Sequence, residues 1–140
     1  IFTGRQYNMP LYYALMDIFV LPAHREGFPR SPMEASAMGV PAIVTDIRGC
    51  REAVHNGRNG CLVPLGDAEA LAGAMLDLLT NPDRAGPMGR VGRQMAGEYF
   101  DEQLTFKTIQ REYSRLLHQS GYAPPRPQPE PSVTLSALEY

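Results

Sequence analysis

Two apolar runs of strand length limit what this chain can fold into more than any other feature. Residues 18–21 read IFVL and residues 42–45 read AIVT, so both are apolar almost throughout. Strands of this kind are buried on both faces, and here a helical pattern separates them. The sequence therefore predicts an α/β fold, with a Rossmann-like, doubly wound parallel sheet that helices cover on both sides.

The segments around these runs predict helices and one further strand. A helix with proline in its first turn is expected over 9–17, and another follows the loop and ends at Gly39. Asp67 is predicted to cap an amphipathic helix over 66–82. The face of this helix expected to be buried carries Leu71, Met75, Leu78 and Leu79. The other predicted elements are a short helix within 47–60, a strand over 61–64, and helices over 83–98 and 101–118.

Length and composition indicate one compact domain. The chain has 140 residues, of which 44% are hydrophobic and 20% charged, as in an ordinary globular protein. We expect residues 1–118 to form this domain and residues 119–140, which include GYAPPRPQPEP, to form a flexible Pro-rich tail. The chain begins with IFTG and has no initiating Met, so it reads as a piece of a longer protein.

The charges, the cysteines and the hydropathy argue against several classes of function. The formal net charge is -2 and the arginines are scattered, so we expect no nucleic-acid partner. Cys50 and Cys61 form no CxxC motif and lie near no histidine pair, which predicts reduced, buried thiols in place of a metal site. No apolar run approaches the roughly 20 residues of a membrane span, and no signal-peptide pattern occurs. We expect a cytoplasmic protein, at most peripheral to the inner face of the membrane.

The loop and helix EGFPRSPMEASAMG, residues 26–39, carry the polar chemistry of the sequence. This stretch follows the carboxyl end of the first apolar strand and enters a helix, which is where open α/β sheets bind their ligands. A helix start presents unpaired N–H groups and a partial positive charge, so a phosphate is the natural ligand. Gly27 allows the backbone to come close to such a ligand.

The position of Glu34 relative to Ser31 and Glu26 supports two interpretations. Ser31, Pro32 and Glu34 match a capping box, with Ser31 as the N-cap and Glu34 as the third helical residue. Glu26 lies before that cap and has no such structural role. Its simplest interpretation is a solvated acid on the surface of the loop. Two carboxylates on either side of a phosphate-sized gap also suit vicinal diols, because each accepts two hydrogen bonds. A nucleotide-sugar fits this pattern, with ribose at one glutamate and the transferred sugar at the other.

At these residues the sequence resembles a known family, the retaining GT-B glycosyltransferases of family four. The donor-binding domain of that family carries two glutamates with seven residues between them, as Glu26 and Glu34 have here. The match is specific because the pair is in register with FVLP, with EA-x-A-x-G-x-P-x-I-V-T-D and with NG-x-L-V-P. The resemblance covers residues 2–5, 12–54 and 56–79, and more loosely the helices to about residue 117. It implies one half of a GT-B fold with C-terminal helices.

The resemblance also implies a role for each residue of the loop. Glu26 is implied to be catalytic, lying against the donor sugar near its anomeric carbon, and Glu34 is implied to hold the ribose hydroxyls. Gly4 and Arg5 are implied neighbours of the nucleobase, and no cofactor or metal ion is implied. The backbone along the loop is implied to face the diphosphate, which adds Gly27, Phe28, Pro29, Arg30, Ser31 and Met33 to the nucleotide-sugar contacts.

Some positions depart from the family pattern. Where many members have Gly-Leu-Pro, this chain has Pro29, Arg30 and Ser31, so one amide donor is missing, and Pro32 removes another. Arg30 is able to compensate by pairing with a phosphate, although a salt bridge to Glu26 or a solvated surface position fits equally well. His24 occupies a position that resembles a variable part of the loop, and it is a weak candidate for a base.

The predicted function is the donor-binding part of a retaining glycosyltransferase. The enzyme would move a hexose from an NDP-sugar, with a UDP-sugar as the family expectation, to a sugar or a lipid-linked acceptor at a membrane surface. Such transfer belongs to polysaccharide or glycoconjugate synthesis. The resemblance further implies an amino-terminal, acceptor-binding domain upstream of this chain, without which the chain is expected to be inactive. Two alternatives remain, a non-catalytic nucleotide-binding module and another GT-B enzyme such as a sugar-nucleotide epimerase.

Overall fold

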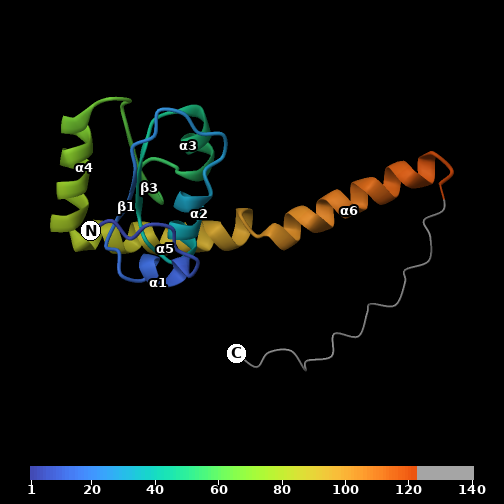
Figure 1. Ribbon diagram of the computed structural model, residues 1–140, viewed down its shortest axis with the longest axis horizontal. Coiled ribbons are helices and arrows are strands. Elements are labelled where there is room, and N and C mark those ends of the chain that lie inside the picture. Colours follow the sequence, from blue (N-terminus) through green and yellow to red (C-terminus); the bar gives the residue numbers. More distant parts are fainter. Residues whose placement is uncertain (123–140) are drawn as a thin grey trace, which may run out of the picture. The chain divides into compact units, whose positions relative to one another are not determined.

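The computed structural model of the protein describes residues 1–122 (Figure 1). The chain divides into two compact units, residues 1–101 and residues 102–140. The first unit holds the sheet and five helices, and it contains every residue predicted to bind a ligand. From residue 123 onwards, the predicted Pro-rich tail lies outside the described residues.

The sheet of the first unit is parallel, as the two apolar runs predicted. Its strands are β1 (Phe19–Leu21), β2 (Ala42–Thr45) and β3 (Gly60–Val63), in the order β1-β2-β3. Val20 lies opposite Ile43, and Ile43 lies opposite Cys61 in the third strand. All three strands therefore end at one edge of the sheet, where α/β proteins bind their ligands.

The helices follow the predicted order. They are α1 (Met9–Tyr13), α2 (Arg30–Ala37), α3 (Arg48–Ala53), α4 (Ala68–Thr80), α5 (Pro82–Tyr99) and α6 (Glu102–Gln119). The first helix is shorter than the predicted span of 9–17. Beyond Tyr13 the chain tightens into a turn, because Leu15 and Met16 donate to carbonyls three residues back rather than four.

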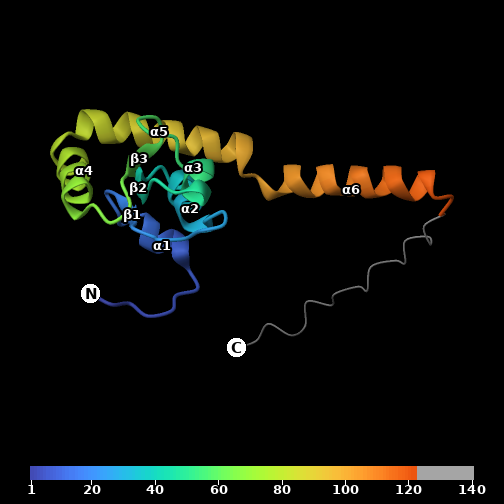
Figure 2. The ribbon, with the colours of Figure 1, turned by 90° about the horizontal axis from the view of Figure 1, so that it is seen from above.

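Both faces of the sheet are buried, which confirms the doubly wound arrangement. Figure 2 shows α4 on one side of the strands and α2 and α3 on the other, while α5 runs past the strands and packs against both α4 and α2. The layer under α2 and α3 comprises the buried residues Ala42, Val44, Cys50, Ala53 and Val54. The opposite layer comprises Ile43, Cys61, Val63, Leu78 and Met88. Alternate residues of β2 thus face opposite layers, as a strand's side-chain geometry requires.

The start of α4 confirms the predicted cap, whereas its buried face is narrower than predicted. The Asp67 carboxylate accepts a 2.8 Å hydrogen bond from the Ala70 N–H. Leu78 is buried, and Leu71 and Met75 pack against the same layer. Leu79 was predicted on this face, but it is 52% exposed. Successive helical residues differ by about 100°, so Leu79 is turned past the edge of the face that Leu78 occupies.

A glycine after α2 redirects the chain into β2. Gly39 has a positive φ of 77° and lies one residue beyond the cap residue Met38. The Gly39 N–H donates to the Ser36 carbonyl and the Val40 N–H to the Ala35 carbonyl, both at 2.9 Å. These two bonds form a Schellman motif, in which a left-handed residue costs least when it is glycine. The helix therefore ends where the sequence predicted.

A buried asparagine fixes the connection between α3 and β3. Asn59 is fully buried, and its side-chain oxygen accepts a 2.7 Å bond from the His55 N–H. Its amide nitrogen donates to the Ala53 carbonyl at 3.1 Å and to the Ser36 hydroxyl at 3.4 Å. The side chain thus joins α2, the end of α3 and the loop that precedes β3.

The described part of the second unit consists mainly of α6. This helix has no buried residue, and its last turn contains His118. Across residues 1–122, no helix combines the length and the apolar character that crossing a bilayer requires.

Candidate functional site

The loop between β1 and α2 begins at the carboxyl edge of the sheet. Pro29 is the buried N-cap of α2, with an extended backbone (φ −71°, ψ 126°), and the helix begins at Arg30. No side chain caps this start, so the capping-box reading of Ser31 and Glu34 is wrong. Glu34 is the fifth helical residue rather than the third. The helix can begin before Pro32 because the N–H groups of its first turn have no intrahelical partner, and proline's missing N–H costs little there.

Glu34 is held by a residue that sequence reasoning missed. The Tyr13 hydroxyl, at the end of α1, donates a 2.9 Å hydrogen bond to Glu34 Oε2. Tyr13 is 2% exposed, whereas the side chain of Glu34 keeps 42% of its surface open. Burial, and after it the hydrogen bond and charge of Glu34, raise the pKa of Tyr13 well above its usual value. Tyr13 therefore remains a donor at neutral pH. A buried tyrosine needs a partner for its hydroxyl, but sequence alone does not say which.

Arg30 pairs with Glu34, one turn further along α2. Its Nε lies 3.8 Å from Glu34 Oε1, and its side chain is 80% exposed. The predicted alternative of a salt bridge to Glu26 is therefore wrong, because residues four apart on a helix share a face. A contact this long and this exposed contributes little to stability.

Glu26 lies half-buried in the loop, and the start of α3 packs against its backbone. A Cβ atom at Gly49 would lie 2.8 Å from the Glu26 carbonyl carbon, and closer still to the carbonyl oxygens of Glu26 and Gly27. The approach of α3 thus requires glycine at position 49, a second residue that sequence reasoning missed. The neighbouring Cys50 is buried, and burial and then the charge of Glu26 raise the pKa of its thiol.

The other predicted residues of this stretch differ in how far their side chains are exposed to solvent. Gly27 faces open space, since a Cβ atom there would meet no atom within 4 Å. Phe28 is 51% exposed and meets Phe100 edge to face, with ring centroids 6.0 Å apart. Met33 packs its side chain into the layer under α2 and α3, and Ser31 is half-buried in the first turn of the helix.

Gly4 and Arg5 belong to the segment that precedes α1. Both are exposed, Gly4 has a positive φ of 64°, and the Arg5 guanidinium lies 5.4 Å from the centre of the Tyr7 ring. Within residues 1–122 neither residue forms a hydrogen bond or ion pair with residues 26–34.

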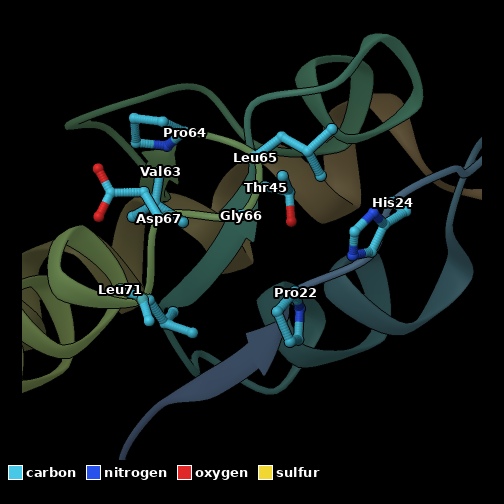
Figure 3. A pocket seen from close by; sticks show the side chains of 10 residues that line it. Pro22, His24, Thr45, Val63, Pro64, Leu65, Gly66, Asp67 and Leu71 are labelled. Carbon is cyan, nitrogen blue, oxygen red and sulfur yellow. The ribbon is translucent and has the colours of Figure 1, made fainter.

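A cavity of about 180 Å³ opens at the carboxyl ends of the strands, beside the loop. The side chains of His24 and Thr45 both face this hollow (Figure 3). It is completed mainly by the connection between β3 and α4, from Pro64 to Ala68, and by Leu71. Neither Glu26, in the loop, nor Glu34, in α2, lines it. Among the described residues no group of His, Cys, Asp and Glu is arranged to hold a metal ion.

The fold and the loop together define a class, the α/β proteins that bind a ligand at the carboxyl edge of a parallel sheet. Residues 1–81 match the family described as Glycosyl transferases group 1. The chain therefore belongs to this family, as the resemblance predicted.

Relatives and solved structures agree with this assignment. The capsular polysaccharide biosynthesis glycosyltransferase CapM of Staphylococcus aureus is 33% identical over 109 residues, which are 78% of this chain and 29% of that protein. The GDP-mannose-dependent alpha-(1-6)-phosphatidylinositol monomannoside mannosyltransferase of Mycolicibacterium smegmatis is 36% identical over 96 residues, 64% of this chain and 25% of that protein. Sucrose-phosphate synthase from Thermosynechococcus elongatus superimposes with a TM-score of 0.76 at 30% identity, covering 79% of this chain and 28% of that one.

These matches confirm the predicted fold class, because the neighbours are GT-B glycosyltransferases. The chain spans between a quarter and a third of the length of the proteins it matches. The roles assigned to Glu26, Glu34 and the rest of the loop stay predictions.

Proposed function

We propose that this chain is the donor-binding portion of a retaining glycosyltransferase that takes a hexose from a nucleotide-sugar. One observation carries the proposal, the pair of half-buried carboxylates, Glu26 and Glu34, on either side of the start of α2. A diphosphate at that helix start would place a sugar near one carboxylate and a ribose near the other. Polysaccharide or glycoconjugate synthesis is the proposed setting, supported by the name of the relative from S. aureus.

The helix start supplies the diphosphate site in this proposal. The N–H groups of Arg30 and Ser31 have no intrahelical partner, while Pro32 has no N–H to offer and the Met33 N–H faces the carbonyl of the N-cap residue Pro29. The open backbone at Gly27 leaves room for an oxyanion to approach. Donors fixed by the fold stabilise the charge that develops on a departing nucleoside diphosphate, and they need no rearrangement during the reaction. Arg30, with its weak and exposed contact to Glu34, is free to turn toward a phosphate.

The two carboxylates have different proposed tasks. Glu34 accepts hydrogen bonds from the ribose hydroxyls, so it acts in donor affinity. Glu26 is the proposed catalytic residue, which lies against the transferred sugar and stabilises positive charge near the anomeric carbon during transfer. Gly4 and Arg5 remain proposed neighbours of the nucleobase.

The nucleobase and the acceptor are open to direct test. A UDP-sugar is the first donor to examine, and a GDP-sugar is the second, because the relative from M. smegmatis is named for GDP-mannose. That relative is also named for phosphatidylinositol monomannoside, which supports a lipid-linked acceptor presented at a membrane surface. We further propose a cytoplasmic location, an upstream acceptor-binding domain, and transfer without a cofactor or metal ion.

The decisive experiment compares two glutamate variants in the complete enzyme. Glu34→Gln keeps an oxygen that accepts from Tyr13 but removes the charge, so donor affinity is expected to weaken about tenfold at nearly constant melting temperature. Glu26→Gln is expected to lower kcat with a smaller effect on donor affinity. Glu69→Gln, at an exposed position in the first turn of α4, is the matched control and is expected to change neither.

Two results together would contradict the proposal. Nucleotide affinity that is unchanged in Glu34→Gln, together with turnover unchanged in Glu26→Gln, would remove both carboxylates from the site. Retention is checked separately by NMR of the product, since inversion at the anomeric carbon excludes the proposed reaction class.

A further inference from the structure

The contact between Tyr13 and Glu34 joins two helices that are far apart in the sequence. Tyr13 ends α1 and lies 21 residues before Glu34. Its ring is packed among Ala35, Val40 and Phe19, and the Phe19 ring centroid is 6.0 Å away. The ring has no room to move, so the hydroxyl occupies one fixed position beside the carboxylate.

The geometry of Glu34 leaves a defined part of the carboxylate open. Tyr13 donates to Oε2 at 2.9 Å, while Oε1 has the long, exposed contact with Arg30. An ionised carboxylate has about four acceptor sites, so most of them remain available to a ligand. The burial of the phenol keeps it protonated, and it therefore donates throughout the neutral range.

We propose that Tyr13 is a positioning residue for Glu34, which it holds in the orientation that accepts the two ribose hydroxyls of the donor nucleotide. This inference rests on the proposed function of the loop. A half-exposed glutamate on a helix otherwise samples several rotamers, and ordering it on binding lowers affinity. With the hydroxyl of Tyr13 in place, the orientation is set before the ligand arrives. Loss of this hydroxyl alone is expected to weaken binding about three- to tenfold.

A purely structural role is the alternative, since a buried tyrosine hydroxyl needs an acceptor in any case. The two roles differ in one measurable respect. A positioning role acts through the ribose hydroxyls, so its effect disappears with a nucleotide that lacks them. A structural role affects all nucleotides equally.

The experiment uses the complete enzyme and two probes, a nucleoside diphosphate and its 2′,3′-dideoxy analogue. UDP and GDP are both titrated, and the one that the wild type binds more tightly is used. The variants are Tyr13→Phe, which keeps the ring, Glu34→Gln, and the combination of the two. Tyr12→Phe is the matched control, because Tyr12 precedes Tyr13 in α1.

For each variant the quantity reported is the ratio of the two dissociation constants on one sample, which is independent of the fraction of folded protein. We expect Tyr13→Phe to lose about three- to tenfold in affinity for the ribonucleotide and nothing for the dideoxy analogue. Tyr12→Phe should match the wild type, and Tyr13→Phe should add no further loss to Glu34→Gln.

Two patterns overturn the inference in different ways. If Glu34→Gln weakens ribonucleotide binding while Tyr13→Phe keeps the wild-type ratio, Tyr13 does not position Glu34 and the proposed function stands. The same conclusion follows if Tyr13→Phe weakens both nucleotides alike. If the wild type shows no preference for the ribonucleotide, or binds neither probe, the proposed ribose site itself is wrong and the inference falls with it.

Discussion

Replacing Gly49 by alanine tests whether the start of α3 sets the position of Glu26. The added methyl group would lie 2.8 Å from the Glu26 carbonyl carbon, whereas ordinary contacts of a Cβ atom begin near 3.4 Å. Every atom that it meets belongs to the backbone of Glu26 or Gly27, so no flexible side chain can turn away. The loop or α3 must therefore shift, by roughly 1 Å once the closer carbonyl oxygens are included.

The expected loss of stability is modest because two effects oppose each other. Overpacking of this kind costs about 1 to 3 kcal/mol. Alanine in place of glycine within a helix stabilises the folded state by about 0.5 to 1 kcal/mol. Because the loop at Gly27 and Phe28 is exposed, it can move and relieve part of the strain. We therefore expect a net destabilisation of about 0 to 2 kcal/mol, measured as the free energy of unfolding in urea.

The expected loss of activity is larger than the loss of stability. A displacement of about 1 Å at a positioned catalytic group can cost about 100-fold in rate. In the complete enzyme we expect Gly49→Ala to reduce kcat by about 10- to 100-fold while most of the protein stays folded. Gly73→Ala in α4 is the control, since a Cβ atom there meets nothing within 4 Å. Equal activity of the two variants would refute the argument that α3 fixes the loop.

Three further predictions concern the stability of the fold. Asp67→Ala removes the cap of α4 and should lower the free energy of unfolding by about 1 kcal/mol, measured by thermal denaturation; Asp67→Asn should lose much less. Asn59→Leu leaves the buried Ala53 carbonyl and the partly buried His55 N–H without their side-chain partner and should cost about 2 kcal/mol in urea unfolding, and an unchanged midpoint would contradict the role assigned to Asn59. Burial raises the pKa of Cys50 and Cys61, so above the pKa of a free thiol the folded state keeps protons that the unfolded state loses. The free energy of unfolding should therefore be constant below about pH 8.5 and decrease above it. In the Cys50→Ala, Cys61→Ala double variant this decrease should be smaller.

The fold was predictable from sequence where local signals decide the structure. The runs at 18–21 and 42–45 became strands because they are apolar on both faces, a property that needs no knowledge of distant residues. Gly39 and Asp67 ended and began their helices through hydrogen bonds to residues at most five positions away. Such contacts can be inferred from a short window of sequence.

The prediction from sequence was wrong where a local motif favoured one helix start and the packing of neighbouring elements required another. Ser31, Pro32 and Glu34 fit a capping box, yet α2 begins at Arg30 because the extended Pro29 already supplies a residue in N-cap geometry. A capping box would delay the helix by two residues relative to the observed start. The loop length between β1 and α2 decides between these starts, and it is set by the packing of both elements.

The sequence predicted the chemical groups of the candidate site, but it did not predict the residues from other helices that contact them. Glu26 and Glu34 stood out because they occupy the loop that follows β1 and the helix that this loop enters, with the spacing of the family pattern. Tyr13 and Gly49 did not stand out, since each meets the loop from another helix more than 20 residues away in sequence. Neither has an unusual local context, because tyrosine near a helix end and glycine in the first turn of a short helix attract no attention in a sequence.

These two contacts have a common consequence for the loop. The loop between β1 and α2 has no regular structure of its own, so its position depends on the elements that surround it. Gly49 brings α3 against the backbone at Glu26, and Tyr13 brings α1 against the side chain of Glu34. The separation between the two carboxylates is therefore set from outside the loop, by helices packed on the sheet. It follows that changes at Gly49 or Tyr13 should weaken binding or turnover without changing which ligand is bound.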